Sequence, residues 1–154
     1  MLILLQMEPP GIILGLVSIV PVILYPLAKR VTDYPQAVLG LTFNFGALIG
    51  WAAISEQFQW PMVWLYAGCI AWTFGYDTVY AHQDKTDDAI VGVRSTALKF
   101  GDGSKRAISV SYIIAVFLWL FTLLSIGLSV FLSISLVGLL VVTGRMLLQL
   151  WRTD

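Results

Sequence analysis

Residues 107–144 read AISVSYIIAVFLWLFTLLSIGLSVFLSISLVGLLVVTG, and these 38 residues include no Asp, Glu, Lys or Arg. A bilayer hydrocarbon core about 30 Å thick requires roughly 20 apolar residues per helix. The stretch is therefore long enough for two membrane spans. We place them at about 107–124 and 130–151, joined by a turn near 127–129.

Three further uncharged stretches precede this one, at residues 9–28, 34–55 and 57–76. They predict spans at about 11–27, 35–55 and 60–76, which makes five in total. Helices satisfy all their backbone hydrogen bonds inside lipid, and these runs lack the dyad alternation of barrel strands. The expected fold class is all-α, a polytopic transmembrane helix bundle.

The composition agrees with a membrane protein. Hydrophobic residues make up 58% of the chain, charged residues 12%, and the mean hydropathy is +0.86. Soluble domains carry about 45–50% apolar and about 25% charged residues, so a water-soluble globule is excluded. The net charge of +0 indicates no nucleic-acid partner. The apolar composition makes the lipid bilayer the expected surrounding of the chain. The single cysteine excludes an internal disulfide.

The basic residues predict an orientation. The first link between spans contains Lys29 and Arg30, the third link is also basic, and Arg152 follows the last span, whereas the second and fourth links have no basic residue. Basic residues in alternate links are the pattern of the positive-inside rule. The basic links, and the polar region 77–106 with them, are expected to face the cytoplasm or an organelle matrix.

The polar region contains a cluster of acids. Taken as one helix, residues 77–88 place Asp77, Asp84 and Asp88 within an arc of roughly 40° at the membrane boundary. Mg²⁺ is held in proteins by one or two carboxylates together with substrate phosphates, so this face is a candidate Mg²⁺–diphosphate site. The alternative is a solvated loop whose acids balance Lys85, Arg94 and Lys99.

A second candidate element lies at the same membrane surface. Tyr25 and Lys29 are four residues apart and so share a helix face, and Arg30 follows directly. Either cation can pair with phosphate oxygens or a substrate carboxylate. The alternative is that these residues only set the membrane orientation.

Small and polar residues inside the spans suggest helix packing. Asn44 is a polar group in the second predicted span, where a hydrogen bond between helices is its expected role. Glycines recur along the spans, and close approach of helix backbones is the expected use of Gly40, Gly46, Gly50, Gly127, Gly138 and Gly144.

Two segments together carry a family resemblance. Residues 76–88, YDTVYAHQDKTDD, continue into GVRSTAL at 92–98, and residues 25–30, YPLAKR, precede PQAVLGLTFNFGA at 35–47. These segments closely resemble the UbiA-type intramembrane prenyltransferases, including the second aspartate-rich motif of that family. Within the family they are most similar to the 4-hydroxybenzoate polyprenyltransferase branch of ubiquinone synthesis.

The resemblance implies Mg²⁺-dependent transfer of a polyprenyl group from polyprenyl diphosphate to 4-hydroxybenzoate. It assigns Asp84 and Asp88 to Mg²⁺ binding and Asp77 to the upstream catalytic acid of the motif. Tyr25 and Lys29 match the family's Y-x-x-x-K element near the diphosphate, and Arg30 is the adjacent substrate-binding position.

The chain also departs from the family pattern. The first family motif, N-D-x-x-D-x-x-x-D, is absent, because the single asparagine, Asn44, is followed by Phe45. Family members have nine helices, and the five predicted here resemble the fourth to the eighth. We therefore expect residues 1–154 to be a single prenyltransferase domain, incomplete at the N-terminus and at the C-terminus.

Other functions are compatible with the residues. The missing motif suggests a non-catalytic membrane fragment or truncated isoform, and acids at a membrane edge also occur in cation or proton transporters. The resemblance implies a mitochondrial inner membrane with the Asp-rich loop facing the matrix, and a bacterial plasma membrane is the alternative.

Overall fold

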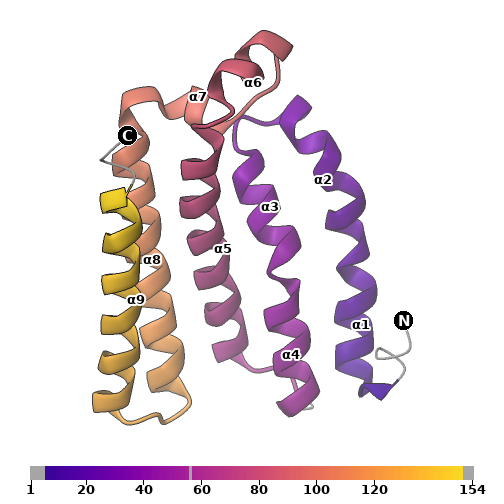
Figure 1. Cartoon of the computed structure of the whole chain (residues 1–154). Helices are drawn as coiled ribbons and strands as arrows, with labels where there is room; N and C mark the ends of the chain where they lie inside the picture. Colours follow the sequence, from indigo (N-terminus) through magenta and orange to yellow (C-terminus); the bar gives the residue numbers. More distant parts are fainter. Residues whose placement is uncertain (1–5, 56, 151–154) are drawn as a thin grey trace.

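The computed structural model describes residues 6–55 and 57–150, and every regular element among them is helical. The long helices run roughly alongside one another, while α6 and α7 lie across one end of the bundle (Figure 1). The all-α class predicted above is confirmed. Arg152, one of the basic residues used to predict orientation, lies outside the described residues.

The first half of the bundle consists of two interrupted helices. Helix α1 (Pro9–Val17) continues into α2 (Ile19–Val31) after a break at Ser18. Pro21 contributes to this break, because it has no N–H to donate to the carbonyl of Val17. Helices α3 (Pro35–Phe43) and α4 (Phe45–Ser55) are likewise separated by Asn44.

The Asn44 side chain compensates for the break that it marks. Its Nδ2 donates to the carbonyl oxygen of Gly40 at 2.8 Å, within its own segment. The same atom lies 3.2 Å from the carbonyl oxygen of Cys69 and 2.8 Å from Oγ1 of Thr73, both in the next helix. Asn44 therefore joins two helices by hydrogen bonds, as predicted.

The second half of the bundle contains three long helices, α5 (Trp60–Ala81), α8 (Ser104–Ser125) and α9 (Val130–Leu150). Helix α5 packs against α3 on one side and α8 on the other, and α9 packs against α8. The turn between α8 and α9 contains Gly127 with φ of +80°, a conformation that favours glycine. The predicted turn at 127–129 is confirmed.

Between α5 and α8 the chain forms a polar cap of short elements: α6 (Lys85–Val91), α7 (Thr96–Phe100) and the 3₁₀ turn η2 (Gly101–Gly103). Figure 1 shows α6 and α7 at the end of the bundle where α2 leads into α3. Gln36 fixes α7 there, because its buried Oε1 accepts a hydrogen bond from the backbone N–H of Thr96 at 3.1 Å.

Three helical segments of the described chain are long and apolar enough to cross a membrane: Pro9–Val31, Pro35–Ser55 and Thr96–Ser125. A shorter apolar helix covers Val130–Val142. Large apolar side chains such as Ile54, Ile113 and Phe131 are exposed on the bundle, which is the arrangement expected of helices surrounded by lipid.

One local expectation is wrong. Residues 77–88 do not form a single helix, because α5 ends at Ala81 and α6 begins at Lys85. The last turn of α5 tightens, with the N–H of His82 donating to the carbonyl of Val79 at 3.1 Å. The helical wheel that placed three acids on one face therefore does not apply across this turn.

Candidate functional site

The segment between α6 and α7 is attached to the end of α2. The N–H of Arg94 donates to the carbonyl of Lys29 at 2.9 Å, and its Nη1 donates to the carbonyl of Val31 at 3.3 Å. The acidic region and the Y-x-x-x-K element, whose residues Asp88 and Lys29 are 59 positions apart in the sequence, therefore meet at one end of the bundle. The sequence predicted this shared membrane surface.

The central contact is an ion pair. Nζ of Lys29 lies 3.2 Å from Oδ1 of Asp88. The Asp88 side chain is only 8% exposed, whereas that of Lys29 is 44% exposed. The other oxygen of Asp88, Oδ2, is buried and has no hydrogen-bond partner among the described residues. A buried carboxylate oxygen without a partner is costly, so this atom is a candidate ligand position.

Helix α6 holds Asp88 in place from both ends. Asp84 precedes the first residue of the helix, and its carbonyl accepts from the N–H of Asp88 at 2.8 Å. Gly92 ends the helix with φ of +75°, and the N–H of Val93 returns to the carbonyl of Asp88 at 3.0 Å. The Asp84 side chain is exposed, so one acid of the motif is buried and the other faces outward.

Two more predicted residues lie near this pair. Asp77, close to the end of α5, interacts electrostatically with Lys29 and Asp84, and Tyr25 in α2 interacts with Asp77 and Lys29. The structure thus brings together Tyr25, Lys29, Asp77, Asp84 and Asp88. Arg30 differs, because it is exposed and makes no hydrogen bond or ion pair with the described residues.

The ion pairs differ from those expected if the acidic cluster were a solvated loop balanced by Lys85, Arg94 and Lys99. Asp33 in the first link, which the sequence reasoning overlooked, lies 3.2 Å from Nζ of Lys99 and 3.6 Å from Nε of Arg94. Two of the three cations that would have balanced the acidic cluster therefore share the carboxylate of Asp33. The sequence signal that could have indicated this position is the closeness of Asp33 to Lys29 and Arg30, because all three belong to the same short link.

His82 lies in the turn between α5 and α6. Burial, and secondarily the positive charge of Lys85, lower the pKa of its imidazole below the ordinary value. Neutral imidazole is therefore favoured at pH 7 beside the acidic motif.

The chemistry of these donors suits Mg²⁺. In the described part of the chain, no three His, Cys, Asp or Glu side chains converge as a ready metal-binding set. Mg²⁺ does not need such a set, because it usually takes one or two carboxylates and completes its coordination with phosphates and water. The unpartnered Oδ2 of Asp88 and the exposed Asp84 one helical turn earlier fit that requirement.

Comparison with known proteins supports the same family as the motifs. The model of the UbiA prenyltransferase family matches residues 1–154. A protein of Aedes aegypti named "4-hydroxybenzoate polyprenyltransferase, mitochondrial" is 51% identical over 110 residues, which cover 71% of this chain and 25% of that protein. Proteins with the same name from Schizosaccharomyces pombe and Arabidopsis thaliana are each 53% identical, over 67% of this chain and 30% and 26% of their own lengths.

The chain thus spans about a quarter to a third of the length of these three relatives. No solved structure gives a significant match. The match of the family model over the whole chain, together with about 50% identity to these relatives, shows that the chain belongs to the UbiA prenyltransferase family.

Proposed function

We propose that this chain forms part of a Mg²⁺-dependent enzyme that transfers a polyprenyl group from polyprenyl diphosphate to 4-hydroxybenzoate in ubiquinone biosynthesis. The observation that carries the proposal is the Lys29–Asp88 pair, with its unpartnered carboxylate oxygen, at the polar end of an apolar bundle. The choice of substrates rests on the names of the similar proteins from three organisms.

The residues have distinct roles in this proposal. Asp84 and Asp88 hold Mg²⁺, which when bound neutralises charge on the diphosphate leaving group. Lys29 and Arg30 bind diphosphate oxygens by charge-assisted hydrogen bonds. Tyr25 and Asp77 lie beside Lys29 and orient it toward the diphosphate.

The reaction is an electrophilic aromatic substitution. The bond between the allylic carbon and the diphosphate oxygen breaks, and the electron pair leaves with the diphosphate. The ring carbon ortho to the phenol of 4-hydroxybenzoate forms a bond to the allylic cation and then loses its proton. Apolar helices around the reacting carbon exclude water, which would otherwise capture the cation.

We also propose a membrane arrangement for this function. Helices α5 and α9, with 22 and 21 residues, cross the bilayer together with the three candidate spans, which gives five spans out of nine in the whole domain. Two observations support this arrangement: α5 and α9 both pack against α8, and spans were predicted from the sequence at 60–76 and 130–151. In this arrangement the membrane is the mitochondrial inner membrane and the polar cap faces the matrix; the names of the relatives include the word mitochondrial.

The test is to replace Asp84 by Asn in the full-length protein that contains this chain and to measure prenyl transfer at saturating Mg²⁺. We expect transfer to fall by at least 100-fold with membrane insertion intact, because removing one preorganised group that stabilises charge in a transition state costs about 10²–10³ in rate. Asp87→Asn is the matched control, since Asp87 is an exposed acid on the same helix. Undiminished transfer by Asp84→Asn contradicts the assignment.

A second candidate is a non-catalytic membrane fragment or truncated isoform. It is favoured by the absence of the N-D-x-x-D motif from the 154 residues. Prenyl transfer by the purified 154-residue chain would exclude it, whereas transfer only by a longer protein would agree with it.

A further inference from the structure

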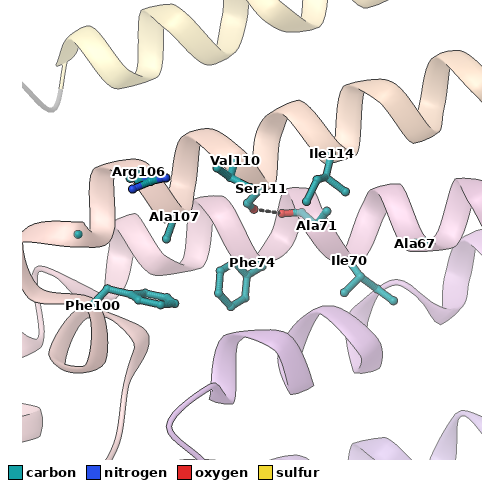
Figure 2. Close-up of a pocket in the computed structure, with 11 residues that line it drawn as sticks. Ala67, Ile70, Ala71, Phe74, Phe100, Arg106, Ala107, Val110, Ser111 and Ile114 are labelled. Carbon is teal, nitrogen blue, oxygen red and sulfur yellow. Dashed lines mark hydrogen bonds between the residues drawn. The ribbon is translucent and has the colours of Figure 1, made fainter.

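A groove between α5 and α8 lies apart from the candidate site. Its volume is about 550 Å³, within the range of small-molecule sites, and its walls are mostly apolar. Figure 2 shows Ala71 and Phe74 of α5 facing this space, together with Ala107 and Val110 of α8. None of the six residues assigned to substrate, metal or catalysis lines the groove.

The groove is open at the surface of the bundle. Val110 and Ile114 line it, and both are 47% exposed although they belong to an apolar helix. Residues 106–114 follow about 12 Å of the helix axis, at about 1.5 Å per residue. The groove therefore covers less than half the thickness of a hydrocarbon core of about 30 Å and extends inward from the polar cap.

One end of the groove carries a positive charge. Arg106 lines it beside Phe100, and in Figure 2 these two residues lie together at one end, while Ile70 and Ile114 lie toward the other. Arg106 is exposed and makes no hydrogen bond or ion pair with any described residue. Lys99 at the same cap is, by contrast, paired with Asp33.

An apolar groove with an unneutralised guanidinium at its membrane-surface end is complementary to an amphiphile with an anionic head and a hydrocarbon chain. We propose that this groove binds an anionic phospholipid, whose phosphate pairs with Arg106 and whose acyl chain lies between α5 and α8. Basic pockets between membrane helices on the matrix or cytoplasmic side bind such head groups. The proposal does not rest on the enzymatic function proposed above.

The occupant is a bilayer lipid rather than the prenyl substrate. The groove has a single cation and no carboxylate among its lining residues, so it lacks the metal ligands that a diphosphate requires. The residues suited to a diphosphate gather instead around Lys29 and Asp88.

The test is native mass spectrometry of the full 154-residue chain in detergent, titrated with phosphatidylglycerol or phosphatidylcholine of the same acyl composition. We expect Arg106→Gln to weaken phosphatidylglycerol binding about fivefold, the effect of one basic residue at an anionic head group, and to leave phosphatidylcholine binding unchanged. Arg106→Lys should retain most of the affinity because it keeps the charge. Circular dichroism verifies that each variant is folded.

Two further variants locate the lipid. Lys105→Gln removes the same charge one residue away, but Lys105 does not line the groove, so phosphatidylglycerol affinity should stay unchanged. Ala67→Leu narrows the groove and should weaken both lipids. The proposal is overturned if Lys105→Gln and Arg106→Gln weaken phosphatidylglycerol binding equally, or if the unchanged chain binds the two lipids with equal affinity. It is also overturned if farnesyl diphosphate displaces phosphatidylglycerol from the groove and this displacement depends on Arg106.

Discussion

The two carboxylate oxygens of Asp88 have different surroundings. Oδ1 lies 3.2 Å from Nζ of Lys29, whereas Oδ2 is buried without a partner among the described residues. The lysine pairs with one carboxylate oxygen only, so the other oxygen remains available as a ligand. Lys29 therefore has two proposed roles at one place, as the partner of the acid and as a ligand of the diphosphate.

Asn44 provides the first stability prediction. Asn44→Ala removes the hydrogen bonds from Nδ2 to α5, and Thr73→Val removes one of their acceptors. Hydrogen bonds between membrane helices contribute about 0.6 kcal/mol on average and up to about 1.7 kcal/mol. We expect each variant to lower the free energy of unfolding by about 1 kcal/mol, measured by SDS titration in mixed micelles.

The double variant tests whether the two side chains act together. Asn44→Ala with Thr73→Val should cost less than the sum of the single changes, because both remove the same hydrogen bond. Ser125→Ala is the control, since the Ser125 hydroxyl bonds only to the carbonyl of Phe121 in its own helix. Fully additive losses would show that Asn44 and Thr73 are not coupled.

At the scale of elements, α5 and α8 approach closely where α5 has glycines. A Cβ atom placed on Gly68 would lie 2.6 Å from Nε1 of Trp119, and one on Gly75 would lie 2.5 Å from Cε1 of Tyr112. The Tyr112 ring lies against Trp72 with centroids 4.7 Å apart and an angle of 40° between the ring planes, so it has little room to move. These glycines allow two aromatic residues of α8 to lie against α5.

We expect Gly75→Ala to destabilise the helix pair. Overpacking of this kind costs about 1–3 kcal/mol, and the better helix propensity of alanine offsets up to about 1 kcal/mol of it. Gly138→Ala is the matched control, because a Cβ atom there meets no described atom within 4 Å, and it should be neutral or stabilising. The same SDS titration compares the two variants, and equal stability of both would contradict the packing argument.

The glycines also show where sequence patterns fall short. Gly40 does lie against α5, since its Cβ position is 3.0 Å from the carbonyl oxygen of Ile70. The other five predicted glycines meet nothing described within 4 Å, and one of them, Gly127, lies in the turn between α8 and α9. Recurrence along a helix identifies which residues permit close approach. Which of them are used depends on the rotation of each helix against its neighbour.

The whole molecule has two ends of different character. The link between α2 and α3 and the polar cap meet at one end, joined by the pairs that Asp33 makes with Arg94 and Lys99. The α4–α5 and α8–α9 links lie at the opposite end (Figure 1). This arrangement matches the alternation of basic links expected from the positive-inside rule.

Cysteine labelling tests the membrane topology. In a Cys69→Ser background, we expect Thr32→Cys and Thr86→Cys to react with an impermeant maleimide from one side of sealed vesicles. Gln57→Cys and Leu128→Cys should react only from the other side, because an odd number of spans separates the two groups. Equal labelling of all four positions from one side would contradict the five-span arrangement.

The helical class and most helix positions follow from local features of the amino-acid sequence. Uncharged runs of about 20 residues must form helices in lipid, where each backbone group needs an internal partner, so length and composition suffice. The predicted span at 35–55 accordingly matches the candidate span Pro35–Ser55, interrupted at Asn44, and residues 60–76 are helical as part of Trp60–Ala81.

The partners of the charged side chains, by contrast, depend on how the helices pack. The acids of 77–88 were expected on one helix face, yet the turn after Ala81 divides them between α5 and the start of α6, with Asp88 buried and Asp84 exposed. Likewise, no local pattern shows that Lys29 pairs with Asp88, or that Asp33 takes the cations of the cap. Such pairs form between helix ends far apart in the chain, so their partners are set by how the helices pack.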